Sequence, residues 1–149
     1  MATTNVQMGK DPSQRLIAVY NAGTTDIPAN QAVIIDASNI LDNAGVKNQI
    51  AVTLPTDTTN PSVCLGITNV LIPAKTEGTV IPANSGQMAI GTCDGAVTAG
   101  TVVDNSVTST KTGRIKTHTA GKYSLALALA TGADGDEIPV LMSHAAPNA

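Results

Sequence analysis

The segment Ser124-Leu-Ala-Leu-Ala-Leu-Ala130 decides the fold class of this chain. Its leucines alternate strictly with alanines, so Leu125, Leu127 and Leu129 fall on one face and the alanines on the other. A period of two is typical of a β-strand, whereas an amphipathic helix needs apolar spacings of three and four. The segment therefore predicts a strand.

The residues that follow this strand predict a hairpin. Residues 131–137 read Thr-Gly-Ala-Asp-Gly-Asp-Glu, and residues 138–142 read Ile-Pro-Val-Leu-Met. Glycine and aspartate favour tight turns, so the pattern is strand, turn, strand. Pro139 has no backbone N–H to donate, and we expect it on an edge strand or at a bulge.

The rest of the chain has the same character. Val, Ile and Thr make up 45 of the 149 residues, and β-branched side chains suit pleated strands better than helices. Glycines and prolines separate short apolar runs, which predicts an all-β fold, a small β-barrel or β-sandwich of roughly 8–11 short strands. One short helix is expected over residues 37–43, with Ser38 as its cap. The predicted strands are Leu16–Tyr20, Ala32–Asp36, Gln49–Leu54, Val63–Ile72, Gln87–Gly91, Val97–Val103, Arg114–Thr117, Ser124–Ala130 and Glu137–Met142.

A short motif recurs along the chain. Ile27-Pro-Ala-Asn30 and Val97-Thr-Ala-Gly100 each precede a predicted strand, and Ile81-Pro-Ala-Asn84 repeats the first of them. Each motif places Asn or Gly where a tight turn needs a positive φ. No fixed period links the three copies, so we interpret them as a recurring turn geometry and not as a repeat array.

The domain organisation follows from where apolar side chains begin. Residues 1–15 hold only scattered apolar side chains and predict an extended N-terminal arm, while residues 16–149 predict a single β domain. An arm of this kind is ordered only when something ties it down. We therefore expect it to contact a neighbouring molecule through four candidate interface residues, Val6, Met8, Lys10 and Arg15.

The composition is that of a subunit in an assembly. The chain has no Trp and no Phe, and Tyr20 and Tyr123 are its only aromatic residues. Charged residues are 13% of the chain, against about 25% in typical domains. A core built from small aliphatic side chains buries less surface per residue, and uncharged polar surface costs less to desolvate. Both features favour a protein that gains stability from contacts with other chains.

Several functional classes are disfavoured. The net charge is −3 and the eight Lys and Arg residues are scattered, so no basic stripe is present to bind nucleic acid. No apolar run is long enough for a membrane span, so no membrane partner is expected. The N-terminus lacks the basic and apolar regions of a signal peptide, and we expect a chain without an export signal.

No pattern of catalytic or ligand-binding residues emerges. His118 and His144 stand outside any metal-ligand spacing, and a solvated histidine is the simplest interpretation of each. The acidic residues of segment 131–137 lack the remaining ligands of a calcium loop and are interpreted as turn residues. Cys64 and Cys93 are expected to be buried free thiols. The sequence therefore predicts no enzyme, no cofactor and no metal site.

Several turn and strand motifs follow one another in a characteristic order: Ile27–Asp36, Cys64–Thr68, Glu77–Val80, Asp94–Val103, Gly113–Lys116 and Leu127–Leu141. This order resembles that of the tailed-phage capsid decoration proteins, also called cement proteins. The resemblance implies a small β-barrel or β-sandwich on the outer surface of the virion capsid. It also implies the major capsid protein as a partner, a homodimeric or homotrimeric state, synthesis in the host cytoplasm, and a role in stabilising contacts between capsomers.

Two other functions stay open. A receptor-binding or glycan-binding fibre component of a virion is the main alternative, although sugar sites usually use aromatic faces and this chain has two tyrosines. A capsid shell protein is a third possibility, and the chain is short for the main shell protein of a tailed phage.

Overall fold

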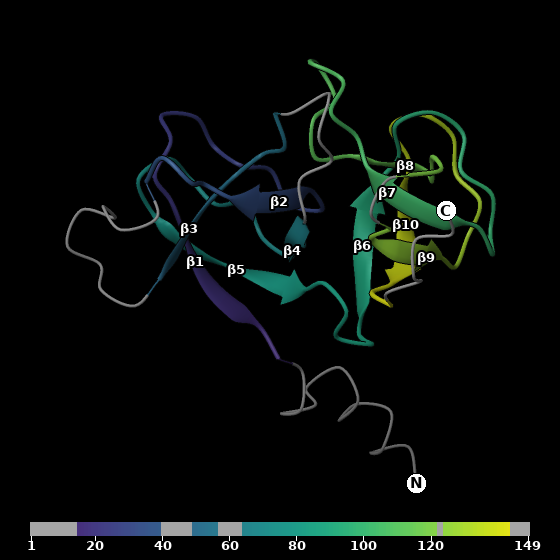
Figure 1. Ribbon diagram of the computed structural model, residues 1–149, viewed down its shortest axis with the longest axis horizontal. Helices are drawn as coiled ribbons and strands as arrows, with labels where there is room; N and C mark the ends of the chain where they lie inside the picture. Colours follow the sequence, from purple (N-terminus) through teal and green to yellow (C-terminus); the bar gives the residue numbers. More distant parts are fainter. Residues whose placement is uncertain (1–14, 40–48, 57–63, 122–123, 144–149) are drawn as a thin grey trace, which may run out of the picture.

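The computed structural model describes residues 15–39, 49–56, 64–121 and 124–143, and these residues form an all-β fold without a helix (Figure 1). The number of strands lies within the expected range, so the predicted fold class is confirmed. The ten strands are β1 (Ile17–Asn21), β2 (Ala32–Ile35), β3 (Ile50–Thr53), β4 (Cys64–Thr68), β5 (Glu77–Pro82), β6 (Met88–Thr92), β7 (Val102–Asn105), β8 (Ile115–Thr117), β9 (Ala126–Ala128) and β10 (Glu137–Leu141).

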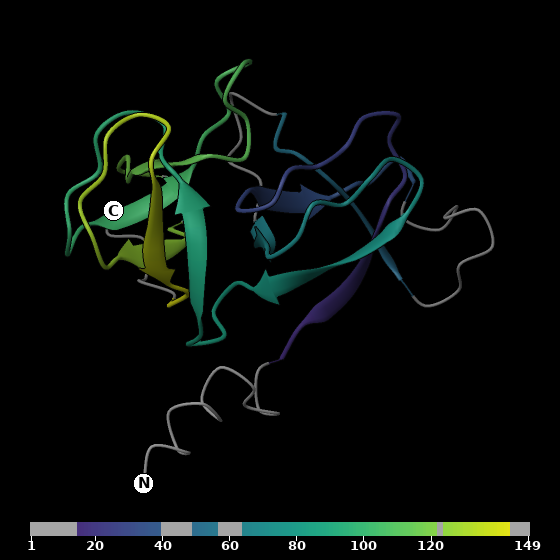
Figure 2. The same cartoon turned by 180° about the vertical axis from the view of Figure 1, so that it is seen from behind.

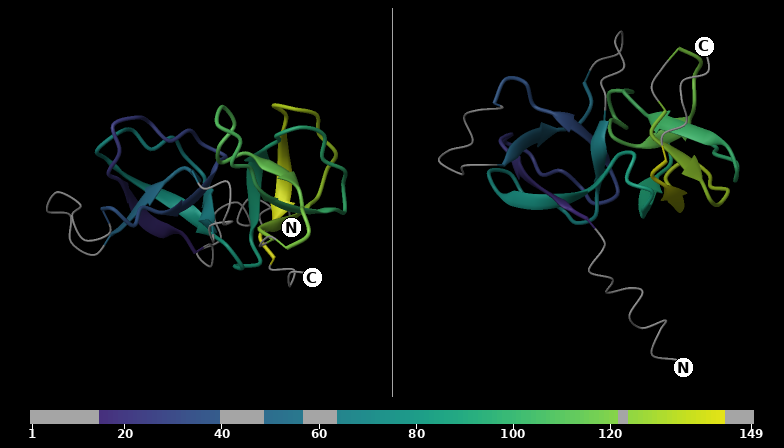
Figure 3. Two further views of the ribbon diagram at one scale, coloured as in Figure 1. Left: turned by 45° about the horizontal axis from the view of Figure 1, so that its top comes forward. Right: turned by 60° about the horizontal axis from the view of Figure 1, so that its bottom comes forward.

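The strands are divided between two lobes that lie side by side, as Figures 1 and 2 show from opposite sides. The first lobe is a closed barrel with the strand order β1-β3-β2-β4-β5. The second lobe is a five-stranded sheet with the order β6-β10-β9-β7-β8. A parallel bridge between Cys93 and Ile115 joins the end of β6 to β8, so the second sheet also curls toward closure (Figure 3).

The second lobe repeats the first, strand for strand and register for register. Strands β1 to β5 correspond in order to β6 to β10, and each neighbouring pair in one lobe has its counterpart in the other. Cys93–Ile115 even reproduces the parallel pairing that closes the first barrel. Matched partners are Val33–Gly66 with Val103–Ala126, Thr68–Val80 with Ala128–Val140, and Asn21–Val52 with Cys93–Ile115.

One backbone bridge recurs in both lobes. Ile27 and Ile72 exchange two N–H···O=C hydrogen bonds of 2.9 and 2.8 Å in the first lobe, and Val97 and Gly132 exchange two of 2.9 Å in the second. A two-residue turn follows each bridging residue and leads into β2, β5, β7 or β10. The chain contains a structural repeat after all. Its period varies because the loops differ in length, so a fixed spacing could not reveal it.

The turns after these bridges need a left-handed backbone, as the sequence motif predicted. Asn30 has φ +63° and Gly100 has φ +83°; Asn84, in the remaining copy of the motif, has φ +58° in the turn between β5 and β6. Lys75 and Gly135 occupy the same position in the two turns that the motif does not cover, with φ +60° and +85°. The expected positive φ is confirmed in the three copies of the motif. Lys75 adopts the same left-handed backbone, although lysine tolerates it less readily than Asn or Gly.

At one pair of core positions the two lobes exchange a large and a small residue. Ile72 and Gly78 of the first lobe correspond to Gly132 and Ile138 of the second. A Cβ atom added to Gly78 would lie 2.5 Å from Cγ1 of Ile72, and one added to Gly132 would lie 2.7 Å from Cγ2 of Ile138. Each lobe therefore has room for one isoleucine at this place. In the first lobe it is the bridge residue Ile72, and in the second lobe it is Ile138 on β10.

The two lobes also share a core. Ala32, Ile67 and Ile81 of the first lobe are buried in one apolar cluster with Ala89 and Met142 of the second. Backbone hydrogen bonds cross between the lobes at the same place, from Ala32 N to Gly113 O at 2.6 Å and from Thr92 N to Asn30 O at 3.1 Å. Because the buried side chains and the hydrogen bonds coincide, separation of the lobes would expose both.

The sequence patterns missed one strand and misplaced one residue. Strand β5 was not predicted, because Gly78 and Pro82 interrupt its apolar pattern. Pro139 was expected at a sheet edge or a bulge, and this is wrong: β10 lies between β6 and β9. The backbone nitrogen of Pro139 points toward β9, where that strand has just ended at Ala128, so the sheet loses no N–H donor that a paired strand needs. At this place Leu129 N donates to Pro139 O at 3.0 Å.

The predicted hairpin is confirmed, because β9 and β10 pair antiparallel across the 131–136 turn. The predicted helix is not seen where the structure can test it. Residues 37–39 form a turn in which Asp36 Oδ1 accepts the Ser38 N–H at 3.1 Å, so Asp36 and not Ser38 is the capping group. Residues 40–43 of that helix lie outside the described residues. The division into an arm over 1–15 and a domain over 16–149 stays a prediction.

We predict that substitutions at Gly78 and Ile72 are coupled in their effects on the free energy of unfolding. Gly78→Ala should destabilise the fold by about 1–3 kcal/mol, because the new methyl group overlaps Ile72. Ile72→Ala should cost about 2–5 kcal/mol through the cavity that it leaves. The double variant should be less destabilised than the sum, by about 1–3 kcal/mol, because the methyl group of Ala at 78 occupies that cavity. Urea unfolding of the four proteins measures this, and additive effects would contradict it.

Candidate interaction surface

The described residues offer no metal centre. No group of three or more His, Cys, Asp or Glu side chains among them is arranged to hold a metal ion. In the same part of the chain, no helix is long and apolar enough to cross a membrane. The features that could serve a function are therefore charged, buried polar or apolar groups.

The main charged feature is a cluster that ties three turns of the second lobe together. Lys111 Nζ lies 3.2 Å from Asp94 Oδ1 and 2.9 Å from Asp134 Oδ2, and Arg114 Nη1 lies 3.5 Å from Asp134 Oδ1. Ser106 Oγ donates to Asp94 Oδ2 at 2.5 Å. Each carboxylate is matched by a cation, so this cluster acts as a clamp between turns.

The pKa values of this cluster agree with such a clamp. Burial raises the pKa of Asp94, but hydrogen bonds from Ser106 and Lys111, the Lys111 charge and a hydrogen bond from Thr108 together lower it below its ordinary value. The pKa of Asp134 is lowered by hydrogen bonds from Lys111 and the Gly95 N–H. Hydrogen bonds to Asp134 and Asp94 raise the pKa of Lys111. All three groups are thus held in their charged forms near neutral pH.

His118 is not the solvated histidine that the sequence suggested. Its side chain is mostly buried, and Nδ1 lies 3.6 Å from Oδ2 of Asp104, a carboxylate that is 1% exposed. Asp104 Oδ2 also accepts the Thr119 N–H at 3.0 Å. The carboxylate thereby fastens the turn that follows β8. No sequence motif signalled this contact, since Asp104 lies on β7 and His118 follows β8.

The two cysteines are free and buried, as predicted. Burial, with a smaller effect of the Asp104 charge, raises the pKa of Cys64 to about 12. Burial also raises the pKa of Cys93, and Asp136 and Asp134 add to the effect. A thiol reacts through its thiolate, so neither cysteine is suited to nucleophilic chemistry.

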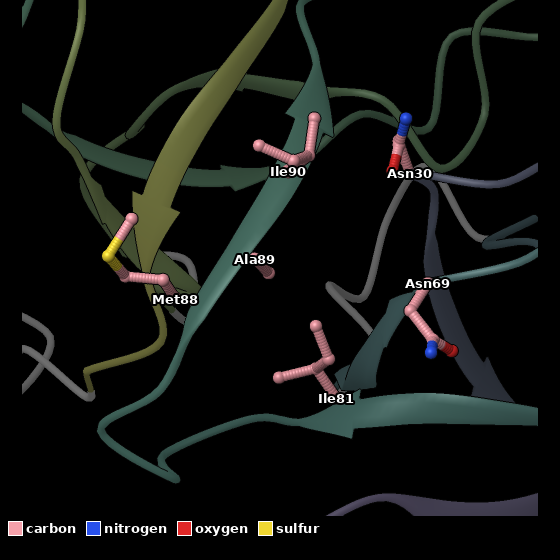
Figure 4. A pocket seen from close by; sticks show the side chains of 6 residues that line it. All are labelled: Asn30, Asn69, Ile81, Met88, Ala89 and Ile90. Carbon is pink, nitrogen blue, oxygen red and sulfur yellow. The ribbon is translucent and has the colours of Figure 1, made fainter. Parts of the chain in front are cut away.

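The apolar feature of interest is a groove between the lobes, with a volume of about 170 Å³ (Figure 4). Met88 and Ile90, on alternate positions of β6, are 60% and 40% exposed. Such exposure of large apolar side chains around a hollow is typical of an interaction surface. The first lobe contributes Asn30, Asn69 and Ile81 to its lining, and β6 contributes Met88, Ala89 and Ile90.

One predicted interface residue lies beside this groove. Arg15 N donates to Gln87 Oε1 at 3.0 Å, and Gln87 Nε2 donates to Arg15 O at 3.0 Å, so residue 15 is fastened to the residue that precedes β6. Val6, Met8 and Lys10 lie outside the described residues. The sequence analysis did not identify Met88 and Ile90 as interface residues. The available signal was that both alternate with Ala89, a small residue that faces the core.

The fold is that of two tandem five-stranded β units, and a solved structure shares it. The crystal structure of the head fiber gp8.5 N base of bacteriophage phi29 is similar to this chain with a TM-score of 0.58 and 7% sequence identity. The similarity covers 89% of this chain and 99% of that one. No protein-family model and no curated protein matches the sequence. At this identity, the likeness concerns the fold.

We predict that the charged clamp loses its effect in acid. Asp94 and Asp134 have folded pKa values below their unfolded values, so their contribution is present above about pH 4 and is lost as the pH falls through the folded values. Lys111→Met should therefore destabilise the protein near neutral pH, with a difference from wild type that shrinks toward about pH 2. Lys116→Met is the control, and an equal effect of both variants at all pH values would contradict the clamp.

We also predict that both thiols are inert in the native protein. A chromogenic disulfide reagent at about pH 8 should label neither Cys64 nor Cys93 until denaturant is added, when both should react. Rapid labelling of the folded chain would show that the cysteines are not buried as described.

Proposed function

We propose that this chain is a non-catalytic structural protein of a phage head, which binds the outer surface of the assembled shell. The observation that carries the proposal is the fold shared, over 89% of the chain, with the base of a head fibre. The major capsid protein is then its partner. Synthesis takes place in the host cytoplasm, before the protein joins the virion.

The physical character of the molecule supports this role. A rigid, repeated β framework with few charges loses little on desolvation when it packs on a shell. Many copies on a symmetric lattice also multiply weak contacts. Within the proposal, the N-terminal arm supplies contacts through Val6, Met8, Lys10 and Arg15, and the protein associates as a homodimer or homotrimer.

Two forms of this function are possible, and they differ in what the bound protein does. As a decoration protein, it stabilises contacts between capsomers. As a fibre component, it serves as an attachment base, and this second candidate is favoured by the fold shared with the base of a head fibre. Both forms require attachment to the shell. Only the decoration role requires that the bound protein make the shell more resistant to heat.

We predict that the purified protein sediments with expanded capsids that lack it, to a saturating and reproducible number of copies per capsid. Removal of residues 1–12 should lower this occupancy, because it removes Val6, Met8 and Lys10. Capsids under heat should then release their contents at a higher temperature when the protein is bound, if it is a decoration protein.

An unchanged release temperature at full occupancy would favour the fibre base over the decoration role. Failure of the complete chain to bind any capsid would contradict the proposed function in both forms. Equal occupancy with and without residues 1–12 would exclude the arm as the attachment element.

A further inference from the structure

The outer edge of β6 is an open sheet edge. Gln87 O accepts from Met142 N at 2.8 Å, and Cys93 N donates to Asp136 O at 2.8 Å, so odd-numbered residues of this strand face β10. Alternate residues of a strand direct their N–H and C=O groups to opposite edges. Met88, Ile90 and Thr92 therefore direct theirs away from β10.

Only the far end of this edge is paired. Thr92 N donates to Asn30 O of the first lobe at 3.1 Å. For Met88 and Ile90, the described residues provide no partner to the outward N–H and C=O groups. Unpaired strand edges bind extended chain segments, which add main-chain hydrogen bonds to the sheet.

The internal repeat shows where this edge is paired in each lobe. On β1, the counterpart of β6, the same edge is covered by β3 from the Val19–Ile50 pair onward. In the second lobe β8 begins only at Ile115, which pairs with Cys93. Met88 and Ile90 correspond to Leu16 and Ala18, which precede the stretch of β1 that pairs with β3. In the second lobe this unpaired part of the edge carries two exposed side chains, Met88 and Ile90, which flank the groove (Figure 4).

We infer that this edge receives residues 4–8 of the N-terminal arm of a second copy of the chain, as an added β-strand. The segment Thr4-Asn5-Val6-Gln7-Met8 alternates polar and apolar residues. One face of such a strand can set Val6 and Met8 against the exposed Met88 and Ile90 side chains of β6, while Asn5 and Gln7 lie on the face that carries Ala89.

The chain's own arm is poorly placed for this position. Its root is fixed, because both backbone groups of Arg15 bind the side chain of Gln87. An antiparallel continuation from that register sets Pro12 opposite Ile90, where Pro12 has no N–H to donate. An arm that arrives from a neighbour carries no such constraint. Mutual exchange of arms between copies also closes into a symmetric oligomer.

Cysteine cross-linking of the full chain tests the inference, with the buried native cysteines retained. A tagged Val6→Cys protein is mixed with an untagged Ile90→Cys protein and oxidised. We expect about ten-fold more mixed disulfide than from Val6→Cys with Ile35→Cys, since Ile35 is similarly exposed but lies on the first lobe. Equal yields would overturn the inference. So would a double variant, Val6→Cys with Ile90→Cys, that forms mainly a disulfide within one chain.

Hydrogen exchange gives a second measurement that needs no cysteine. Deletion of residues 1–12 should speed exchange of the Ile90 amide by about ten-fold, while the Gly91 amide, which faces β10, stays unchanged. No change at Ile90 would overturn the inference. We build here on the proposed arm contact, yet both assays use the protein alone. Capsid binding without cross-linking would therefore reject the arm exchange and leave the proposed function standing.

Discussion

A pair of backbone hydrogen bonds between Ile27 and Ile72 holds the first lobe together, and the same pair between Val97 and Gly132 holds the second. Each bridge brings two distant parts of the chain into contact, and the turns after it lead into β2 and β5 in the first lobe and into β7 and β10 in the second. The turns need a positive φ at their second residue, which Asn30, Gly100 and Gly135 supply at little cost. The strands that follow these turns pair in matching registers in the two lobes.

The packing of the lobes depends on this arrangement. Since the bridge fixes the distance between Ile72 and Gly78, and between Gly132 and Ile138, each lobe can accept one large side chain at the junction. The core is built mainly from aliphatic side chains, and Tyr20 is the one aromatic residue buried among the described residues. The second lobe remains partly open at β6, and the first lobe covers the end of that opening through the Asn30 carbonyl and a shared apolar cluster.

Much of this fold could be predicted from sequence, because period-two alternation and glycine-bounded runs report directly on strands. The alternation in 124–130 located β9, and the Asp-rich turn located the hairpin to β10. The faces could not be assigned in the same way: Ala126 and Ala128 point inward, while Leu129 is left exposed. Strand β5, the buried Asp104 and the central place of Pro139 all depend on long-range pairing, which local patterns do not contain. The site was predicted least well, since Arg15 is the one proposed contact within the described residues, and the β6 edge is a property of the assembled sheet.

These features describe a closed barrel and a five-stranded sheet that share a core, with few charged residues and an apolar groove beside the root of an arm. They suit a protein that functions by contact, as the proposed function requires. The most direct measurement is a cryo-electron microscopy reconstruction of capsids incubated with the full chain. Our account predicts two-lobed density at symmetry-related positions on the outer surface of the shell. An undecorated outer surface at saturating protein would contradict it.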